Sequence, residues 1–214
     1  MTLIFDMDGT MVDNMMTHHR GWQKTLAQYG LELSLEDVRQ TCHGRNMEII
    51  ERLFPGKYPP EERARISEEK ESWYRAIFLT ELTLLPGLAV FLAEAHQAGI
   101  KMGIGSAAPR VNVDFVLDNL QIRSYFQSVV PAEAVENGKP APDVFLQVAA
   151  ELGASPQDCW VFEDSPTGAK TAENAGMKAI ILTTTHAESE FEGIPSVVRF
   201  LPDFTRMNLA NLRS

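Results

Sequence analysis

Two aspartates stand two positions apart directly after the first apolar run of the chain. Residues 3–5 have the character of a short buried strand, and Asp6 and Asp8 follow in a polar loop that contains Gly9. Side chains two positions apart at an extended strand end point the same way, so both carboxylates are expected at one spot. Adjacent carboxylates repel unless a cation or a shared proton intervenes. The pattern predicts a Mg²⁺ site or, alternatively, two aspartates that only cap the loop.

A second acidic pair repeats this arrangement further along the chain. Glu163 and Asp164 follow the apolar run 160–162, and Ser165-Pro166 then opens a helix. The carboxyl ends of parallel strands lie at one edge of a sheet, so this pair is expected beside Asp6. Three or four converging carboxylates would suffice for one Mg²⁺ with water ligands. Capping of the next helix would explain one of the two acids but not their convergence.

Two further positions could bind an anion. Ser106 ends the predicted strand 100–105 and precedes a helix that begins near Pro109, and free N–H groups at a helix start attract phosphate. Simple N-capping is the alternative for Ser106. Lys139 lies in a loop between Gly138 and Pro140, where the prolines favour a fixed position. Its alternative is an ordinary solvated lysine.

Two nucleotide-binding patterns do not fit this sequence. Residues 103–108 match a loose GxGxxA fingerprint, but the first glycines fall within a predicted strand and no acid follows at the expected distance. The GxxxxGK[ST] loop is absent, because Lys139 precedes a proline and has no glycine five positions before Gly138.

Alternating strands and helices predict the elements that must position these residues. Strands are expected at 3–5, 100–105, 128–130, 160–162 and 179–182, with helices at 88–97, 109–120, 143–152 and 166–175. Such alternation is typical of an α/β fold with a doubly wound parallel sheet. Residues 14–84 instead predict four helices without strands, with Ser34 and Asp37 spaced as a capping box. We therefore expect a Rossmann-like core of residues 1–13 and 85–214 and an inserted helical domain of residues 14–84.

Composition limits the partners and the compartment. The net charge is −10 and 44% of the residues are hydrophobic, so a globular chain that repels nucleic acid and anionic lipid is expected. No apolar stretch is long enough to span a membrane and no signal peptide is evident. Cys42 and Cys159 suggest core positions in a reducing compartment. A cytoplasmic monomer is expected, with a dimer as the alternative.

Taken together, the four sites resemble the haloacid dehalogenase-like superfamily, in its β-phosphoglucomutase-like branch. Asp6-Met7-Asp8-Gly9-Thr10 looks like the first motif of that family, Ser106 the second, Lys139 the third and Glu163-Asp164 the fourth. The resemblance covers nearly the whole chain. It implies a Rossmann-like core with a helical cap domain, Mg²⁺ as cofactor and a small phosphorylated metabolite as substrate.

The resemblance also implies a role for each motif residue. Asp6 would be the nucleophile that becomes phosphorylated, and Asp8 the general acid and base. Asp6, the Asp8 carbonyl oxygen and Asp164 would hold Mg²⁺, with Glu163 as a further ligand or an outer partner. The phosphate oxygens would bind to the residues of motifs two and three, namely Ser106, the Ala107 amide and Lys139. A cis peptide bond is expected at Lys139–Pro140.

Residues of the helical insert are expected to select the substrate. His18 and Trp22 match family positions that line the junction of cap and core, and Lys70 matches a cap lysine that meets substrate. A purely structural role is the alternative for Trp22, as core packing, and for His18. The sugar-phosphate mutases carry an arginine where this chain has Met47, and Arg45 lies nearby but not at the matching position. Arg110, just past the phosphate loop of the core, is expected to contact substrate.

These departures decide between the functional hypotheses. Without the matching arginine, and with Asn14 where the mutases carry a hinge threonine, a bisphosphorylated intermediate would lack a grip on its second phosphate. A Mg²⁺-dependent phosphatase for small phosphorylated metabolites such as sugar phosphates is therefore favoured. A β-phosphoglucomutase-type mutase and a non-catalytic binding protein are the alternatives.

Overall fold

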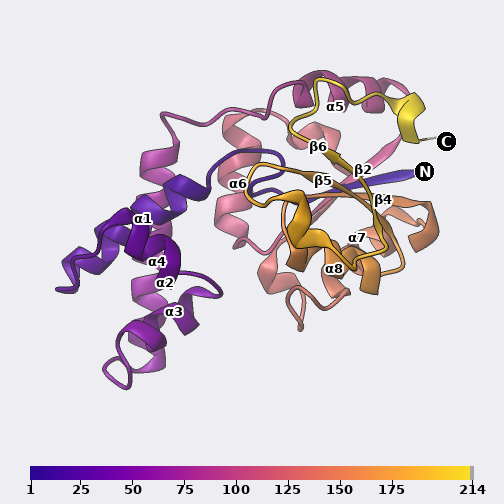
Figure 1. Cartoon of the computed structure of the whole chain (residues 1–214). Helices are drawn as coiled ribbons and strands as arrows, with labels where there is room; N and C mark the ends of the chain where they lie inside the picture. Colours follow the sequence, from indigo (N-terminus) through magenta and orange to yellow (C-terminus); the bar gives the residue numbers. More distant parts are fainter. Residues whose placement is uncertain (213–214) are drawn as a thin grey trace. The chain divides into compact units, whose positions relative to one another are not determined.

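The computed structural model of the protein describes residues 1–212 and contains two compact units (Figure 1). One unit consists of residues 1–13 together with the chain from residue 83 onward, and the other of residues 14–82. The first unit holds a parallel sheet flanked by helices, which confirms the predicted α/β class. The second contains four helices.

The sheet is built from six parallel strands in the order β3-β2-β1-β4-β5-β6. The first strand of the chain therefore lies inside the sheet, between β2 and β4. The strand bounds are β1 Thr2–Phe5, β2 Lys101–Gly105, β3 Ser128–Val130, β4 Cys159–Glu163, β5 Lys178–Leu182 and β6 Val197–Leu201.

Alternation along the strands divides the apolar side chains between two faces. Ile4 of β1 and Val161 of β4 are paired in register and belong to one core cluster. Phe5 and Phe162 are the next pair, and their rings stack on the opposite face with centroids 4.7 Å apart. Because successive strand residues point to opposite faces, a four-residue strand with no exposed side chain must be covered on both sides.

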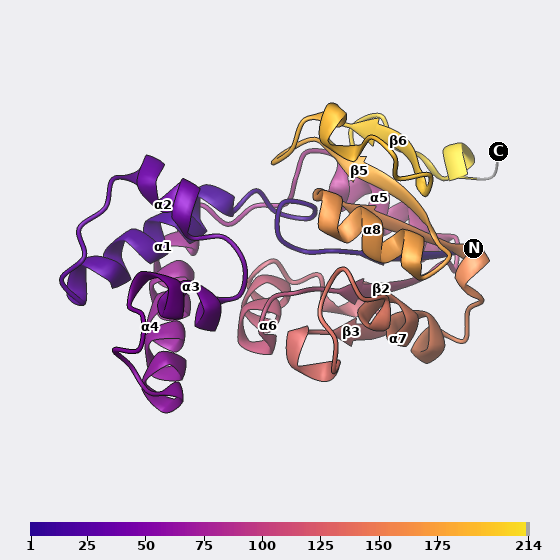
Figure 2. The ribbon, with the colours of Figure 1, turned by 60° about the horizontal axis from the view of Figure 1, so that its bottom comes forward.

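Helices cover both faces, as a doubly wound sheet requires. Val148 of α7 and Ala172 of α8 pack in the same cluster as Ile4. Phe91 of α5 meets the ring of Phe5 on the other face, with centroids 6.4 Å apart. Figure 2 shows these helices beside the strands. The helix bounds in this unit are α5 Leu88–Gln97, α6 Arg110–Asn119, α7 Asp143–Leu152 and α8 Pro166–Asn174, with short 3-10 turns η1 Arg123–Tyr125, η2 Ala132–Ala134, η3 Pro156–Asp158, η4 Glu188–Phe191 and η5 Leu209–Leu212.

The glycines of the loose dinucleotide pattern have a packing role. Gly103 and Gly105 lie within β2, and a Cβ atom on Gly105 would come within 2.8 Å of the Phe145 ring. A Cβ on Gly103 would meet the side chain of Val148. Glycine at these positions lets α7 pack closely against β2, which matters because the loop carrying Lys139 leads into α7.

The helical unit consists of α1 Met15–Gln28, α2 Leu35–Thr41, α3 Asn46–Leu53 and α4 Pro60–Phe78. Its own core includes Trp22, Leu26 and Ile66. The capping box predicted from Ser34 and Asp37 is confirmed, since the Ser34 hydroxyl accepts from the Asp37 amide at 3.1 Å and the Asp37 carboxylate accepts from the Ser34 amide at 3.2 Å.

The sequence analysis missed one strand. β6 lies at the sheet edge, and its residues Val197–Leu201 are mostly part-exposed rather than buried. Such a strand lacks the continuous apolar burial that identifies the inner strands. Cys42 and Cys159 are both buried and unpaired, as expected. Within the described part of the chain, no helix is long and apolar enough to cross a membrane.

Candidate active site

The loop after β1 turns sharply at the carboxyl edge of the sheet. The Asp6 amide donates to the Phe162 carbonyl of β4 at 2.9 Å, which extends the pairing of the two strands by one residue. The Met7 carbonyl then accepts from the amide of Met11 at 2.9 Å, and Gly9 takes a positive φ of 74°. This fixed turn places the Asp6 side chain beside the end of β4.

Three buried carboxylates meet there. Asp6, Glu163 and Asp164 each offer an oxygen, and these oxygens lie within 4.8 Å of one another. The side chains of Asp6 and Glu163 point to the same face because Phe5 and Phe162 are register partners. The convergence expected from the two strand ends is thus present in the structure.

Lys139 pairs with two members of this group. Its Nζ lies 2.7 Å from Asp6 Oδ1 and 2.5 Å from Glu163 Oε1, and it stands 4.7 Å from the ring centre of Phe145. The Lys139–Pro140 peptide bond is cis, as expected. Lys139 is therefore a fixed interior charge, and the solvated-surface alternative is wrong.

The hydrogen bonds of Glu163 leave its carboxylate little freedom. Its Oε2 accepts from the amides of Asp164 and Ser165 at 2.9 and 3.2 Å and from the Ser165 hydroxyl at 3.1 Å. Its Oε1 accepts from Lys139. Both oxygens of Glu163 are therefore engaged. The Glu163 carboxylate, fixed just before α8, holds the ammonium group of Lys139 from the loop before α7.

Two glycines make the close packing of these acids possible. A Cβ atom on Gly168, in the first turns of α8, would overlap the Glu163 carboxylate. A Cβ atom on Gly9 would overlap the Asp164 carboxylate. The acids are thus pressed against main chain, where only glycine leaves them room.

Burial dominates the electrostatics of the cluster. Burial raises the pKa of Asp6 to about 7; Lys139 opposes this, and Glu163 and Asp8 add to it. Burial also raises the pKa of Asp164 well above its ordinary value, with further contributions from Glu163 and Asp6. Burial works to lower the pKa of Lys139, but the carboxylates of Asp6 and Glu163 outweigh it and hold that pKa above its ordinary value.

These side chains fit a divalent cation. Ionised, the three acids carry three negative charges against one positive charge of Lys139, so two negative charges remain uncompensated. Carboxylate oxygens are the ligands that Mg²⁺ prefers in proteins. The raised pKa values of Asp6 and Asp164 are the expected sign of buried acids that share too little positive charge between them.

The structure places Asp8 outside this group of three. Asp8 is partly buried and pairs through its main chain with Val12 in an isolated bridge. Its negative charge still acts on Asp6, whose pKa it raises. The chain does not remain extended past the end of β1, because the amides of Thr10, Met11 and Val12 all donate to the Met7 carbonyl.

The predicted phosphate loop follows the neighbouring strand β2. The Ser106 amide donates to the Val130 carbonyl at 3.0 Å, and its buried hydroxyl accepts from the Ala108 amide at 3.0 Å. A hydroxyl that accepts one hydrogen bond still has its proton to donate. Ala107 is exposed in the same loop. Arg110 is exposed at the start of α6, where its main-chain amide donates to Glu133.

In the helical unit, two of the predicted residues meet. The Nζ of Lys70 lies 2.8 Å from His18 Nδ1 and 2.9 Å from Glu71 Oε1. Trp22 is 2% exposed and belongs to the core of the unit, with Lys70 5.7 Å from its ring centre, so core packing accounts for it. Arg45 is exposed at the N-terminus of α3.

Sequence reasoning missed several residues of these networks. Glu71 also accepts from Asn46 at 2.7 Å; burial works to raise its pKa, but Lys70 and then His18 outweigh this and hold the pKa below its ordinary value. In the sheet unit, Thr184 and Thr185 contact the acidic loops. The one available signal was a run of threonines after a predicted strand of the same parallel sheet.

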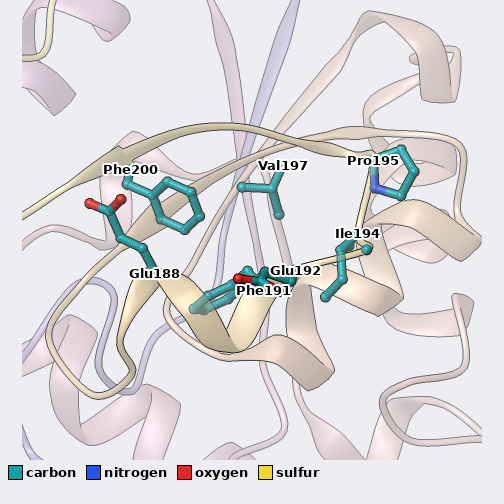
Figure 3. A pocket seen from close by; sticks show the side chains of 8 residues that line it. Glu188, Phe191, Glu192, Ile194, Pro195, Val197 and Phe200 are labelled. Atoms are coloured by element: carbon teal, nitrogen blue, oxygen red, sulfur yellow. The ribbon is translucent and has the colours of Figure 1, made fainter.

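A separate cavity of about 310 Å³ lies between η4 and β6 (Figure 3). Apolar side chains including Phe191, Ile194 and Phe200 line it, with Glu188 and Glu192 beside them. None of the three clustered acids contributes to it, so the chemistry is not located there.

Comparisons with known proteins agree with this geometry. A family model described as haloacid dehalogenase-like hydrolase matches residues 1–176. The chain is 32% identical to fructose-1-phosphate phosphatase YqaB of Escherichia coli (strain K12), over 83% of this chain and 94% of that protein. It is 31% identical to β-phosphoglucomutase of Bacillus subtilis (strain 168), over 83% and 81%.

A solved structure is similar over the whole chain. The crystal structure of CbbY from Rhodobacter sphaeroides in complex with phosphate matches with a TM-score of 0.84 and 27% identity, covering 100% of this chain and 99% of that one. The fold described above thus recurs in a protein whose structure was solved in complex with phosphate.

Proposed function

The chain belongs to the haloacid dehalogenase-like hydrolase family and is an enzyme, and we propose that it hydrolyses small sugar phosphates through an aspartyl phosphate on Asp6. The observation that carries the proposal is the buried group of three carboxylates with Lys139 at the carboxyl edge of β1 and β4. Similarity to a fructose-1-phosphate phosphatase supports the class of substrate.

In the first step, an Asp6 carboxylate oxygen attacks phosphorus and the bond from phosphorus to the ester oxygen breaks. Lys139 supports this role because its ammonium group, 2.7 Å away, opposes the effect of burial and favours the ionised nucleophile. Protonated Asp8 gives its proton to the departing sugar oxygen. The Ser106 hydroxyl, the Ala107 amide and Lys139 donate hydrogen bonds to the phosphoryl oxygens.

In the second step, water attacks the phosphoryl group on Asp6. Asp8, now ionised, takes a proton from that water, the bond from phosphorus to the Asp6 oxygen breaks, and inorganic phosphate leaves.

We assign the metal site to Asp6, Asp164 and the Asp8 carbonyl oxygen, and Mg²⁺ is the ion proposed. When bound, Mg²⁺ neutralises the charge that builds on the phosphoryl oxygens. Glu163 is assigned to holding Lys139, because its two oxygens already accept four hydrogen bonds.

The test is phosphate release from a panel of hexose and hexitol phosphates, with Mg²⁺ or with EDTA. Wild-type protein should release phosphate only with Mg²⁺, and Asp6→Asn should abolish release. Asp158→Asn is the matched control, because Asp158 is exposed before β4, at the amino edge of the sheet. Release that survives in Asp6→Asn would contradict the proposed nucleophile, and an intact panel would contradict the phosphatase.

Mutase activity is the second candidate, favoured by the 31% identity to a β-phosphoglucomutase. Met47 in place of the mutase arginine weighs against it. ³¹P NMR of β-glucose 1-phosphate with a catalytic amount of glucose 1,6-bisphosphate separates the two. A phosphatase yields inorganic phosphate, whereas a mutase yields glucose 6-phosphate.

We propose a cytoplasmic monomer whose partner is the small phosphorylated substrate and not a nucleic acid or a membrane. The net charge of −10 supports the exclusion of polyanions. The helical unit of residues 14–82 is proposed as the cap that selects the substrate, with His18 and Lys70 as its contacts. Arg45 and, in the core unit, Arg110 are the further candidates for such contacts, whereas Trp22 belongs to the core of the helical unit.

A further inference from the structure

The segment after β5 contacts two parts of the acidic site that are distant in the sequence. The Thr184 hydroxyl donates to the Gly9 carbonyl at 2.5 Å. The Thr185 hydroxyl donates to Asp164 Oδ2 and also lies 3.2 Å from the Asp164 carbonyl oxygen. Two consecutive side chains thus join the loop after β1 to the loop after β4.

The contact to Asp164 fixes the orientation of its carboxylate. On one side, Oδ2 lies against Gly9, where a Cβ atom would overlap it. On another side, the Thr185 hydroxyl binds the same oxygen. A carboxylate held through one oxygen by both groups cannot turn about its final bond without losing the hydrogen bond. Its second oxygen, Oδ1, is then presented in one direction.

The hydrogen bond from Thr185 matters because the Asp164 carboxylate has no ion pair with Lys139. Asp164 is 6% exposed, and Lys139 forms its two ion pairs with Asp6 and Glu163 instead. The group that holds Asp164 is therefore a neutral hydroxyl, which supplies no positive charge that would compete with a metal ion.

We infer that Thr184 and Thr185 are positioning residues of the metal site, with Thr185 aiming the Asp164 carboxylate and Thr184 holding the loop that carries Asp8. The inference rests on the proposed function, since it concerns the ion assigned there. Neither threonine touches the reacting atoms. Partners that orient a metal ligand typically change metal affinity by about 10- to 100-fold when removed.

The experiment measures Mg²⁺ binding by calorimetry, without substrate. Thr185→Val keeps the side-chain shape but removes the hydroxyl, and it should raise the Mg²⁺ Kd by about tenfold or more. Thr185→Ser restores the hydroxyl and should return the Kd close to the wild-type value. Thr184→Val should also weaken binding. Thr183→Val is the control, because the Thr183 hydroxyl donates to the Leu201 carbonyl of β6 at 3.4 Å and not to the acidic loops.

A kinetic measurement adds a second readout. Because Thr185 acts through Asp164, saturating Mg²⁺ should restore most of the kcat of Thr185→Val, and the KM for the sugar phosphate should stay at the wild-type value. If circular dichroism shows that Thr185→Val is not folded, Thr185→Ala replaces it in both measurements.

The outcomes separate this inference from the proposed function. Unchanged Mg²⁺ affinity in Thr185→Val, with an active Mg²⁺-dependent wild type, overturns the inference and leaves the phosphatase standing. Equal losses in Thr185→Val and Thr183→Val also overturn it, since a general loosening of the segment would then explain both. Wild-type protein that binds no Mg²⁺ and hydrolyses nothing overturns the proposed function as well.

Discussion

At the scale of single residues, the site is governed by how one lysine is shared among three buried acids. Lys139 pairs with Asp6 and Glu163, so Asp164 depends on a hydroxyl hydrogen bond and on any bound cation. Removing members of this set should therefore have opposite effects on the metal-free protein.

Asp164→Asn should stabilise the metal-free protein at alkaline pH. The folded-state pKa of Asp164 is raised above 3.8, so the folded protein holds this proton more tightly than the unfolded chain. The ionised carboxylate therefore costs stability, and this cost is absent below about pH 4 and grows as the pH rises. In EDTA, the Tm of Asp164→Asn minus that of wild type should increase from pH 4.5 to pH 8.

If Asp164 is a Mg²⁺ ligand, added Mg²⁺ should reverse the order of the two Tm values, so that wild type becomes more stable than Asp164→Asn. Wild-type Tm should then rise with added Mg²⁺ at pH 8, while Asp164→Asn responds little. A Tm difference that is independent of pH in EDTA would contradict the raised pKa. Asp158→Asn, exposed at the other edge of the sheet, is the control.

Lys139→Ala should have the opposite effect on stability. It leaves Asp6 and Glu163 buried without their shared cation, and breaking a buried ion pair costs about 3–5 kcal/mol. Loss of a charge that stabilises the transferred phosphoryl group should also lower kcat by about 10²–10³. Urea unfolding and steady-state kinetics measure the two effects.

Lys170→Ala is the matched control for this substitution. Lys170 pairs with Glu173 on the surface of α8, and such exposed pairs contribute about 0–1 kcal/mol. Equal losses of unfolding free energy and of kcat in Lys139→Ala and Lys170→Ala would contradict the role assigned to Lys139.

At the scale of elements, strand register and close helix packing bring the acids together. The pairing of Phe5 with Phe162 sets Asp6 beside Glu163, and α8 begins against that carboxylate with Gly168. The helix can approach this closely only because the residue there has no side chain.

Gly168→Ala should destabilise the protein although it lies in a helix. In most helices this change gains about 0.5–1 kcal/mol. Here the new Cβ would overlap the Glu163 carboxylate, which must move away from Lys139 or push α8 outward. We expect a lower Tm and a lower kcat, measured by thermal unfolding and phosphate release.

Thr167→Ala is the control for this element. Thr167 is exposed on the same turn of α8 and the substitution also favours helix. Its Tm and kcat should stay near wild type. A Gly168→Ala variant as stable and as active as Thr167→Ala would refute the proposed close approach.

At the scale of the whole molecule, the chain divides into a discontinuous sheet unit and a continuous helical unit. The helical unit has its own core around Trp22, Leu26, Ile50 and Ile66. A segment with its own core and one entry and one exit can fold alone in principle.

The fragment 14–82 should therefore fold on its own. Its circular dichroism should be helical, with a cooperative thermal transition that Ile66→Ala abolishes, because Ile66 is fully buried in that core. A fragment that melts without a transition would contradict the assignment of these residues as a separate domain.

The sequence by itself determined the features that depend on local pattern. Apolar runs predicted five of the six strands, β1 to β5, together with the helices between them, and the spacing of Ser34 and Asp37 predicted the capping box. The acids after two strands could be placed at one edge, because parallel strands align their carboxyl ends.

Only the tertiary structure decided how the site is held. Thr184 meets Gly9 across 175 positions and Lys139 meets Asp6 across 133, and no local period encodes such pairs. The sharp turn after β1 and the edge strand β6 depend likewise on what packs beside them. Local pattern fixes which elements form and which way their ends point, whereas side-chain partners depend on distances that exist only once the sheet has been assembled.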